Sequence, residues 1–418
     1  MTINRIPISV SEALGRVISR VDTLSEEAVP YTESYGRILA EDLRATNDVP
    51  LFTKSAMDGF AIRSEDSAGA GGENRIAFEV VGEVPAGASS DYVLGPNEAF
   101  RIMTGAEVPK SADAVVMFEQ TKETETGFTI RKTFRPDENI AMQGEECRTG
   151  EVIVPKGTHI NPGTVATLAT FGYSRVKVYR QPVVGIMSTG SELLDVEAPL
   201  ERGKIRNSNG PMILSQLKRM NIEGRLYRLE ADDVDTLLSR MEEMLREVDV
   251  VITTGGVSVG DYDHLPELYK KLGAVELFNK VGMRPGSVTT VSFLGNKPLF
   301  GLSGNPSACY SGFELFARPA LLKMMGHDKI FAPVVEAVLD EDFKKPNPFT
   351  RFIRAEVDYV EGRVHARPSG FNKSNAVTSI ARSNGVIVLP GGTRGFEKGD
   401  GVKVMLTDMT TGTDRFDI

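Results

Sequence analysis

The sequence contains few cysteines and histidines, and this scarcity excludes several kinds of site. It has two cysteines, Cys147 and Cys309, which lie far apart and belong to no CxxC pair. Two thiols cannot hold together a chain of 418 residues, so we expect reduced structural thiols in a reducing compartment. The four histidines stand singly at positions 159, 264, 327 and 365. No HxH or HxxxH pair occurs, which argues against a histidine-rich metal site, and no Ser-His-Asp arrangement is indicated.

The chain also lacks an excess of positive charge and any long apolar run. Its 48 lysines and arginines are outnumbered by 57 acidic residues, so the formal net charge is -9. A broad nucleic-acid-binding face needs the opposite balance, although a few cations inside a cleft can still bind a small anion. No run approaches the roughly 20 apolar residues of a membrane-spanning helix. The opening MTINRIPISV has no basic segment followed by an apolar one. We expect a cytoplasmic protein that binds neither nucleic acid nor membrane.

Changes of pattern along the chain predict several domains. A chain of this length exceeds one compact core, and 41% hydrophobic and 25% charged residues indicate a folded protein. Residues 49–143 are rich in short β-branched segments between turns, which predicts a β insertion inside a discontinuous N-terminal domain, 1–48 and 144–181. Strands and helices alternate over 182–328, which predicts a parallel α/β domain. Residues 329–418 are again strand-rich and predict a small β barrel.

Helix-capping patterns support the helices of this division. A capping residue and a partner or proline at the right spacing occur in three pairs: Ser9 with Glu12, Asn161 with Pro162, and Asn209 with Pro211. A polar side chain at such a position accepts a hydrogen bond from a free backbone N–H, and proline fits the first helical turn. Helices are therefore expected to begin at these three points.

Three glycine-containing turns follow strands of the predicted α/β domain. They are STGSEL at 188–193, TTGGVSVGD at 253–261 and GLSGNPS at 301–307. Ligands of a parallel sheet bind beyond the carboxyl ends of its strands, and glycine lets backbone N–H groups approach an anion such as phosphate. One such turn is as easily structural as functional, but three at equivalent strand ends are hard to explain by packing. Gly255, Gly256 and Ser258 of the second turn are expected to hold phosphate.

Carboxylates accompany these turns. Glu192 lies in the first and Asp232 at the start of a predicted helix, while Asp261 ends the second turn and Asp263 follows it. Acidic groups around a phosphate would repel it unless a divalent cation lies between them. Each of the aspartates could instead cap a helix. We take Mg²⁺ as the expected ion, with Glu192 and Asp263 as its candidate ligands.

Basic and small polar residues form a further candidate group. Its members are Lys280 and Arg284 before a Pro-Gly turn, Arg351 and Arg354 in TRFIRAE, and Lys373 and Ser374 in a loop of the last domain. Most surface lysines and arginines are only solvated charges, but a guanidinium held by a rigid turn suits an oxyanion. In the N-terminal half, Asp58 and Thr104 each precede a glycine, where plain turn residues are equally expected.

In combination these motifs resemble those of the molybdopterin molybdenumtransferases, the MoeA family, which includes the E domain of gephyrin and its plant counterpart. SAMDGFA, IMTGA, STGSEL, TTGGVSVGD, RPG and GxSGNP occur in the family's order over nearly the whole chain. The resemblance implies four domains: a discontinuous N-terminal domain, a β insertion, an α/β domain and a C-terminal β barrel. It further implies a homodimer in which the α/β domain of one subunit and the insertion of the other share the active cleft.

The resemblance also implies a reaction and roles for matching residues. Adenylylated molybdopterin and molybdate are the substrates, Mg²⁺ assists cleavage of the pyrophosphate-type linkage, and molybdenum is left on the dithiolene sulfurs as AMP is released. The metal-assisted, pterin-phosphate and nucleotide part of the cleft, taken as catalytic, would contain Asp58, Thr104, Glu192, Asp232 and Asp263. Molybdate would meet Lys280, Arg284, Arg351 and Ser374. The third glycine turn would add substrate contacts from Ser303, Asn305 and Pro306.

Three positions depart from the family pattern. Arg284 and Ser287 stand where KPGK has lysines, and Ser303 replaces the proline of LPGNP. Arginine keeps the charge at 284 with a different donor geometry, whereas Ser287 removes a cation. Neutral variation, altered oxyanion affinity and a shift toward tungstate all remain open.

Two other functions are compatible with parts of the sequence. Residues 182–325 also resemble molybdopterin adenylyltransferases, which use ATP, but the additional domains argue against that activity. A non-catalytic scaffold of the same fold is the second alternative, and the acidic residues beside a phosphate turn argue against it. Transient contacts with other proteins of molybdenum cofactor biosynthesis are also expected.

Overall fold

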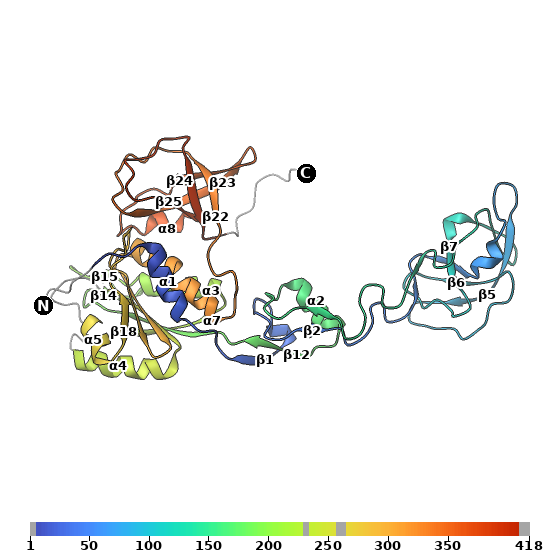
Figure 1. The fold of residues 1–418 in the computed structure, drawn as a ribbon, viewed down its shortest axis with the longest axis horizontal. Coiled ribbons are helices and arrows are strands. Elements are labelled where there is room, and N and C mark those ends of the chain that lie inside the picture. Colours follow the sequence, from blue (N-terminus) through green and yellow to red (C-terminus); the bar gives the residue numbers. More distant parts are fainter. Residues whose placement is uncertain (1–5, 229–233, 256–264, 409–418) are drawn as a thin grey trace. The chain divides into compact units, whose positions relative to one another are not determined.

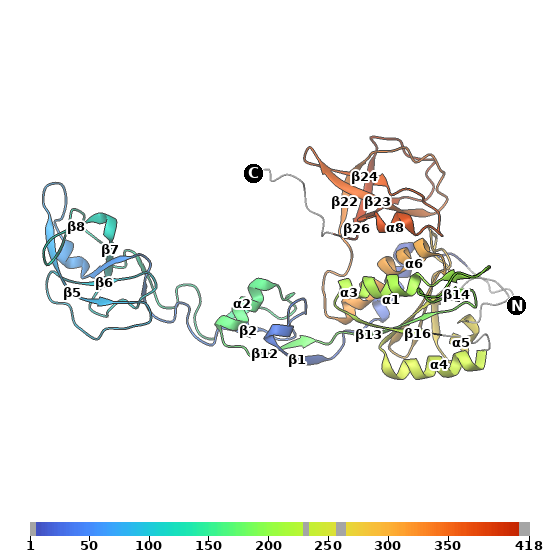
Figure 2. The same cartoon turned by 180° about the vertical axis from the view of Figure 1, so that it is seen from behind.

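The computed structural model describes residues 6–228, 234–255 and 265–408 of the chain. The chain divides into two compact units, of which the first comprises Met1–Ala28, Gly36–Ala40 and Lys177–Ile418, and the second Val29–Tyr35 and Glu41–Val176 (Figures 1 and 2). The strands β1 (Glu26–Pro30) and β12 (Arg175–Tyr179) each run from one unit into the other. No helix within the described residues is long and apolar enough to cross a membrane.

The second unit contains a six-stranded sheet formed by the predicted insertion. Its strands in chain order are β4 (Gly59–Ile62), β5 (Ile76–Val84), β6 (Glu98–Ile102), β7 (Ala114–Met117), β8 (Thr121–Glu123) and β9 (Gly127–Ile130). They lie side by side in the order β7-β4-β6-β5-β9-β8. The rings of Phe60 and Phe78 stack on Phe128 in the core, with centroids 4.1 and 5.4 Å away. The predicted β character of this region is confirmed.

Shorter elements complete the second unit. They are the 3-10 turns η1 (Tyr31–Glu33), η2 (Ser64–Ser67) and η3 (Phe118–Gln120), the strand pairs β2 (Leu43–Arg44) with β11 (Val152–Val154) and β3 (Lys54–Ser55) with β10 (Ile140–Ala141), and the helix α2 (Pro162–Thr170). The α2 helix begins as predicted, because Asn161 accepts a hydrogen bond from the N–H of Thr164 and Pro162 occupies the first turn.

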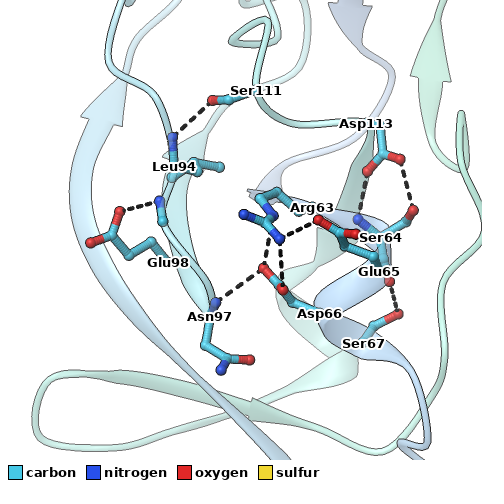
Figure 3. Close-up of polar contacts among 11 residues, drawn as sticks. Arg63, Ser64, Glu65, Asp66, Ser67, Leu94, Asn97, Glu98, Ser111 and Asp113 are labelled. Carbon is cyan, nitrogen blue, oxygen red and sulfur yellow. Dashed lines mark hydrogen bonds and ion pairs between the residues drawn. The ribbon is translucent and has the colours of Figure 1, made fainter.

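A polar cluster closes the far end of β4 (Figure 3). The carboxylate of Asp113 accepts from the N–H and hydroxyl of Ser64 at 2.5 and 2.7 Å, which caps η2. Asp66 accepts from the N–H of Asn97 at 3.0 Å and pairs with Arg63, which also pairs with Glu65. These bonds satisfy backbone donors that would otherwise be unpaired at the turn, so the end of β4 is held firmly.

The first unit is built around a second six-stranded sheet. Its strands are β13 (Val183–Ser188), β16 (Glu223–Arg228), β17 (Val250–Thr254), β18 (Val275–Phe278), β20 (Thr290–Leu294) and β21 (Lys297–Leu302), in the order β16-β13-β17-β21-β20-β18. The first four are parallel, whereas β20 and β18 run antiparallel to their neighbours. The prediction of a parallel sheet therefore needs correction at one edge. Only two residues, Gly295 and Asn296, join β20 to β21, and so short a link allows only a hairpin.

Helices cover both faces of this sheet (Figure 2). One face packs against α1 (Val10–Arg20), α3 (Asn209–Arg219), α6 (Pro306–Gly312), the π-helical turn η4 (Phe313–Ala317) and α7 (Arg318–Met324). The other packs against α4 (Val234–Glu247) and α5 (Leu265–Lys271), and a small parallel pair, β14 (Leu193–Leu194) and β15 (Ile205–Arg206), follows β13. The α1 helix is capped by Ser9 as predicted, at 3.1 Å from the N–H of Glu12.

The predicted Asn209 cap is wrong. Asn209 is the first residue of α3, and its side-chain amide donates to the carbonyl of Gly304 at 2.9 Å. It therefore links the helix start to the third glycine turn. The two residues are 95 positions apart in the sequence, so the local pattern around Asn209 does not predict the contact.

The chain ends in the predicted barrel. Its elements are β22 (Val334–Leu339), β23 (Thr350–Val360), β24 (Arg363–Pro368), the short helix α8 (Thr378–Ala381), β25 (Gly385–Leu389) and β26 (Gly401–Leu406). Strand β23 pairs with both β24 and β25, which closes a ring of five strands. The strand β19 (Met283–Arg284), which lies between β18 and β20 in the chain, adds to this sheet beside β23. The predicted multidomain α/β plus β architecture is thus confirmed, and the four domain boundaries remain our proposal.

Candidate active site

A pocket of about 450 Å³ lies in the first unit where the strand-end turns meet the barrel. Its lining comes from the turn at 284–288, the third glycine turn, the loop and strand at 343–354, and the loop at 372–375. Among the described residues that line it, five are cationic, namely Arg284, Lys345, Arg351, Arg354 and Lys373, and none is acidic. A pocket with this charge favours a small, highly charged anion.

Two of these cations, Arg284 and Arg351, are neighbours because their strands pair. In the parallel pairing of β19 with β23, Arg284 stands opposite Arg351. Burial, and then the neighbouring positive charge of Arg284, lowers the pKa of Arg351. Two adjacent guanidinium groups repel each other, and an anion bound between them would remove that repulsion.

Arg354 lies three residues beyond Arg351 on β23 and is more deeply buried. It is 2% exposed, and burial lowers its pKa to about 10. Its Nε donates to the hydroxyl of Ser379 at 3.1 Å, and its Nη2 lies 3.4 Å from the carbonyls of Phe371 and Lys373. Arg354 therefore holds the loop that carries Lys373 while also lining the pocket.

Hydroxyl and amide groups complete the lining. Ser303, Asn305 and Ser374 all line the pocket. Buried Ser307 holds the last of these, because its N–H donates to the carbonyl of Ser374 at 3.0 Å and its hydroxyl to that of Ala376 at 2.6 Å. The pocket thus offers neutral donors beside its cations, which suits a tetrahedral oxyanion.

The structure gathers most, not all, of the residues predicted to bind molybdate or to make further substrate contacts. Arg284, Ser303, Asn305, Arg351 and Ser374 line one pocket. Lys280 and Pro306 are not among the lining residues. The carbonyl of Lys280 accepts from the N–H of Ile8, and Pro306 is the first residue of α6. The sequence analysis missed Lys345, because a lysine in the loop before a predicted strand resembles any solvated surface charge.

The three glycine turns meet as predicted. Gly255 has φ +83°, and a Cβ there would lie 2.6 Å from the carbonyl oxygen of Thr189 in the first turn. A Cβ on Gly304 of the third turn would lie 3.4 Å from Gly255 Cα. The approach of Gly255 to Thr189 is possible only for glycine, whereas the contact at Gly304 is close to an ordinary van der Waals distance. The residues Gly256, Ser258, Asp261 and Asp263, together with Asp232, lie outside the described part of the chain.

The described residues do not form a magnesium site. Glu192 is exposed in the first turn, and a Cβ on Gly190 would lie 2.4 Å from its carboxylate. Within the described residues no group of three or more His, Cys, Asp and Glu side chains converges. Of the two proposed Mg²⁺ ligands, Glu192 lies within the described residues and Asp263 lies outside them.

The second unit holds Asp58 and Thr104 together. One oxygen of the Asp58 carboxylate accepts from the N–H of Thr104 at 2.7 Å and from its hydroxyl at 2.8 Å. These two hydrogen bonds lower the pKa of Asp58, which stays ionised to lower pH than an ordinary aspartate. Buried Ser55 supports the pair, since its carbonyl accepts from Gly105 and its hydroxyl donates to the carbonyl of Met57.

Comparison with known proteins agrees with this architecture. Family models match the MoeA N-terminal region (domain I and II) at residues 8–172, a probable molybdopterin binding domain at 185–323, and the MoeA C-terminal region (domain IV) at 336–407. The molybdopterin molybdenumtransferases of Staphylococcus epidermidis and Staphylococcus aureus are each 54% identical over 404 residues, which are 97% of this chain and 96% of theirs. The molybdopterin biosynthesis MoeA protein of Pyrococcus horikoshii OT3 is 31% identical with a TM-score of 0.81, over 96% of this chain and 100% of that one. The chain belongs to the MoeA family.

Proposed function

We propose that this protein is a molybdopterin molybdenumtransferase, which inserts molybdenum from molybdate into adenylylated molybdopterin and releases AMP. The observation that carries the proposal is the register of β19 with β23, which sets Arg284 opposite Arg351 in a pocket whose described lining contains no carboxylate. Molybdate is a tetrahedral dianion. The paired guanidinium groups balance its negative charge, and they and the neighbouring hydroxyls donate hydrogen bonds to its oxygens.

The residues divide into two working groups in this proposal. Arg284, Arg351 and Ser374 bind molybdate, with Ser303 and Asn305 at the edge toward the glycine turns. The turn at Gly255 receives a phosphate of the adenylylated pterin through backbone N–H groups. Lys280 and Pro306 would act from outside the pocket lining. The remaining predicted groups are Gly256 and Ser258 for phosphate and Asp58, Thr104, Glu192, Asp232 and Asp263 for catalysis.

The magnesium requirement is part of the proposal and has a direct test. Mg²⁺, when bound, neutralises charge at the phosphate linkage, and Glu192 with Asp263 are its proposed ligands. Removal of divalent ions with EDTA should abolish AMP release, and added Mg²⁺ should restore it. AMP release that continues at the same rate in EDTA would contradict the requirement.

We further propose a cytoplasmic homodimer, as the family resemblance implies. In it Asp58 and Thr104 of one subunit would serve the reaction of the other. Its partners would be adenylylated molybdopterin and molybdate, with transient contacts to other proteins of molybdenum cofactor biosynthesis.

The test of the function is molybdate-dependent release of AMP from adenylylated molybdopterin. Arg351→Ala should raise the KM for molybdate at least tenfold, because it removes a charge-assisted contact worth ~1.5–3 kcal/mol. Arg363→Ala, which replaces an exposed arginine of β24, is the matched control and should change nothing. Equal molybdate dependence in the two variants would refute the role of the pocket.

The same assay separates the alternatives. An adenylyltransferase would accumulate adenylylated pterin from ATP and molybdopterin, and a scaffold would release no AMP under any condition. The barrel contributes Arg351 and Lys345 to the pocket, and a single α/β domain has no equivalent of these residues.

A further inference from the structure

Three cations of the pocket contact neutral aromatic rings. The guanidinium of Arg351 lies over the ring of Phe343 at 5.3 Å, that of Arg284 near the ring of Phe349 at 5.9 Å, and the ammonium of Lys373 over Phe371 at 5.2 Å. No salt bridge within the described residues involves any of these three cations. Aromatic faces stabilise a cation without cancelling its charge. The positive charge therefore stays available to a ligand.

Asn347 makes the most specific of these neutral contacts. Its Oδ1 accepts from Nε of Arg351 at 2.6 Å, and its Nδ2 donates to the hydroxyl of Thr393 at 3.0 Å. The Thr393 hydroxyl in turn donates to the carbonyl of Pro390 at 2.9 Å. That hydroxyl proton is thereby committed, so Thr393 must accept from Nδ2, and the amide oxygen must face Arg351.

The backbone of Asn347 is equally fixed. The residue is 1% exposed, its N–H donates to the carbonyl of Thr393 at 2.9 Å, and its carbonyl accepts from Gly392 at 2.6 Å. Asn347 does not itself line the pocket. It is a rigid support behind Arg351.

We propose that Asn347 is a positioning residue, which orients the guanidinium of Arg351 through Nε and leaves its charge uncompensated for the oxyanion. This inference rests on the proposed function of the pocket. An aspartate at 347 would accept the same hydrogen bond with similar shape, but its charge would cancel that of Arg351. An amide is the side chain that gives orientation without neutralisation.

Two substitutions test orientation and charge separately. Asn347→Ala should weaken molybdate binding about tenfold, because an unrestrained guanidinium must be ordered by the ligand. Asn347→Asp should weaken it by more than Asn347→Ala. Both should raise the KM for molybdate while kcat stays within about twofold. Binding is measured by calorimetric titration of the full protein with molybdate, and turnover by AMP release.

A double-mutant comparison distinguishes positioning from a merely structural role. In an Arg351→Ala background, Asn347→Ala should have no further effect on molybdate affinity. Asn384→Ala is the matched control, since Asn384 is a barrel amide bonded to the N–H and carbonyl of Val357. It should lower the melting temperature and leave molybdate affinity unchanged.

Failure of the positioning role of Asn347 can be distinguished from failure of the proposed function. If the unsubstituted protein neither binds molybdate nor releases AMP, the proposed function fails. If it does both, and Asn347→Asp binds molybdate as tightly as the unsubstituted protein, the positioning role of Asn347 is refuted. The same conclusion follows if Asn347→Ala weakens binding equally with and without Arg351.

Discussion

At the scale of single residues, the neighbours of an ionisable group decide its chemistry. Asp58 is fully exposed, yet two donors from Thr104 keep it ionised and oriented. Arg354 is an interior arginine bonded only to neutral groups among the described residues, and burial alone lowers its pKa to about 10. Neither property can be inferred from the residue type.

Thr104→Val should raise the pKa of Asp58. The substitution removes the hydroxyl donor and leaves the backbone N–H bond, so the pKa moves part of the way back to its ordinary value. Because the folded pKa is depressed, the ionised form is lost as pH falls through it. In the variant the ionised form is lost at higher pH, so the acid limb of the kcat/KM profile shifts to higher pH.

The pKa of Asp58 can be followed by carbon NMR of its carboxyl group, assigned by comparison with Asp58→Asn. Thr104→Ser keeps the hydroxyl and serves as the control. An unchanged pKa in Thr104→Val would show that the hydroxyl bond does not form in solution.

At the scale of elements, the strand-end turns combine strained backbone with close approach. Gly255, Gly286 and Gly190 all have positive φ, and at each a Cβ would lie less than 3 Å from a neighbouring atom. The π-helical turn η4 behind them buries the carboxylate of Glu314 between α3 and α7. These features hold the turns at fixed positions relative to one another.

Gly255→Ala should destabilise the protein by more than the cost of placing alanine in the left-handed backbone conformation of residue 255. A left-handed alanine costs ~1–2 kcal/mol, and displacement of Thr189 O adds ~1–3 kcal/mol. Gly273→Ala is the matched control, because Gly273 has φ +73° and nothing within 4 Å of its Cβ position. Urea unfolding of both variants compares the two losses. Equal losses would mean that the close approach to Thr189 is unimportant.

Glu314→Ala should destabilise the protein by ~1–3 kcal/mol, since it leaves the amide of buried Gln216 without its acceptor and removes the counter-charge of the partly exposed Arg219 and Arg318. Glu314 accepts from Arg219 at 2.6 Å and from Gln216 at 2.8 Å, and Arg318 lies 3.9 Å away. Glu314→Gln keeps an acceptor and should lose less. Thermal or urea unfolding measures both, and a smaller loss for alanine than for glutamine would contradict this account.

At the scale of the whole molecule, the candidate residues fall into two groups on separate compact units. Asp58 and Thr104 belong to the second unit, and the oxyanion pocket belongs to the first. The proposed homodimer gives both groups a part in one reaction, and it predicts that two different defects can complement each other.

At molybdate concentrations well below the raised KM of Arg351→Ala, mixed dimers of Asp58→Ala with Arg351→Ala should recover part of the activity that each homodimer has lost. In random mixing half of the dimers are mixed, and each would hold one intact set of residues, so about a quarter of the normal activity is expected. Size-exclusion chromatography with light scattering verifies the dimer. Mixtures that remain as inactive as the separate variants would exclude a shared site.

Much of the fold and of the candidate site was predictable because their parts are local. Glycine at a strand end, a capping asparagine at 161 and an arginine before Pro285 are each visible within a few residues. The antiparallel strand β20 was missed although its Gly295-Asn296 turn is also local, because β20 and β21 fit an alternating α/β pattern equally well. Lys345 and Asn347 were missed for a different reason, since their importance depends entirely on what lies across the pocket.

The sequence by itself determined the order of elements, the three glycine turns and the family. Backbone conformation, strand and helix patterns and motif order are all properties of short segments. Only the tertiary structure decided that Arg284 stands opposite Arg351, that Asn209 reaches Gly304, and that Asn347 supports the pocket from behind. Those pairings depend on strand register and barrel closure, which are set by packing between segments distant in the chain.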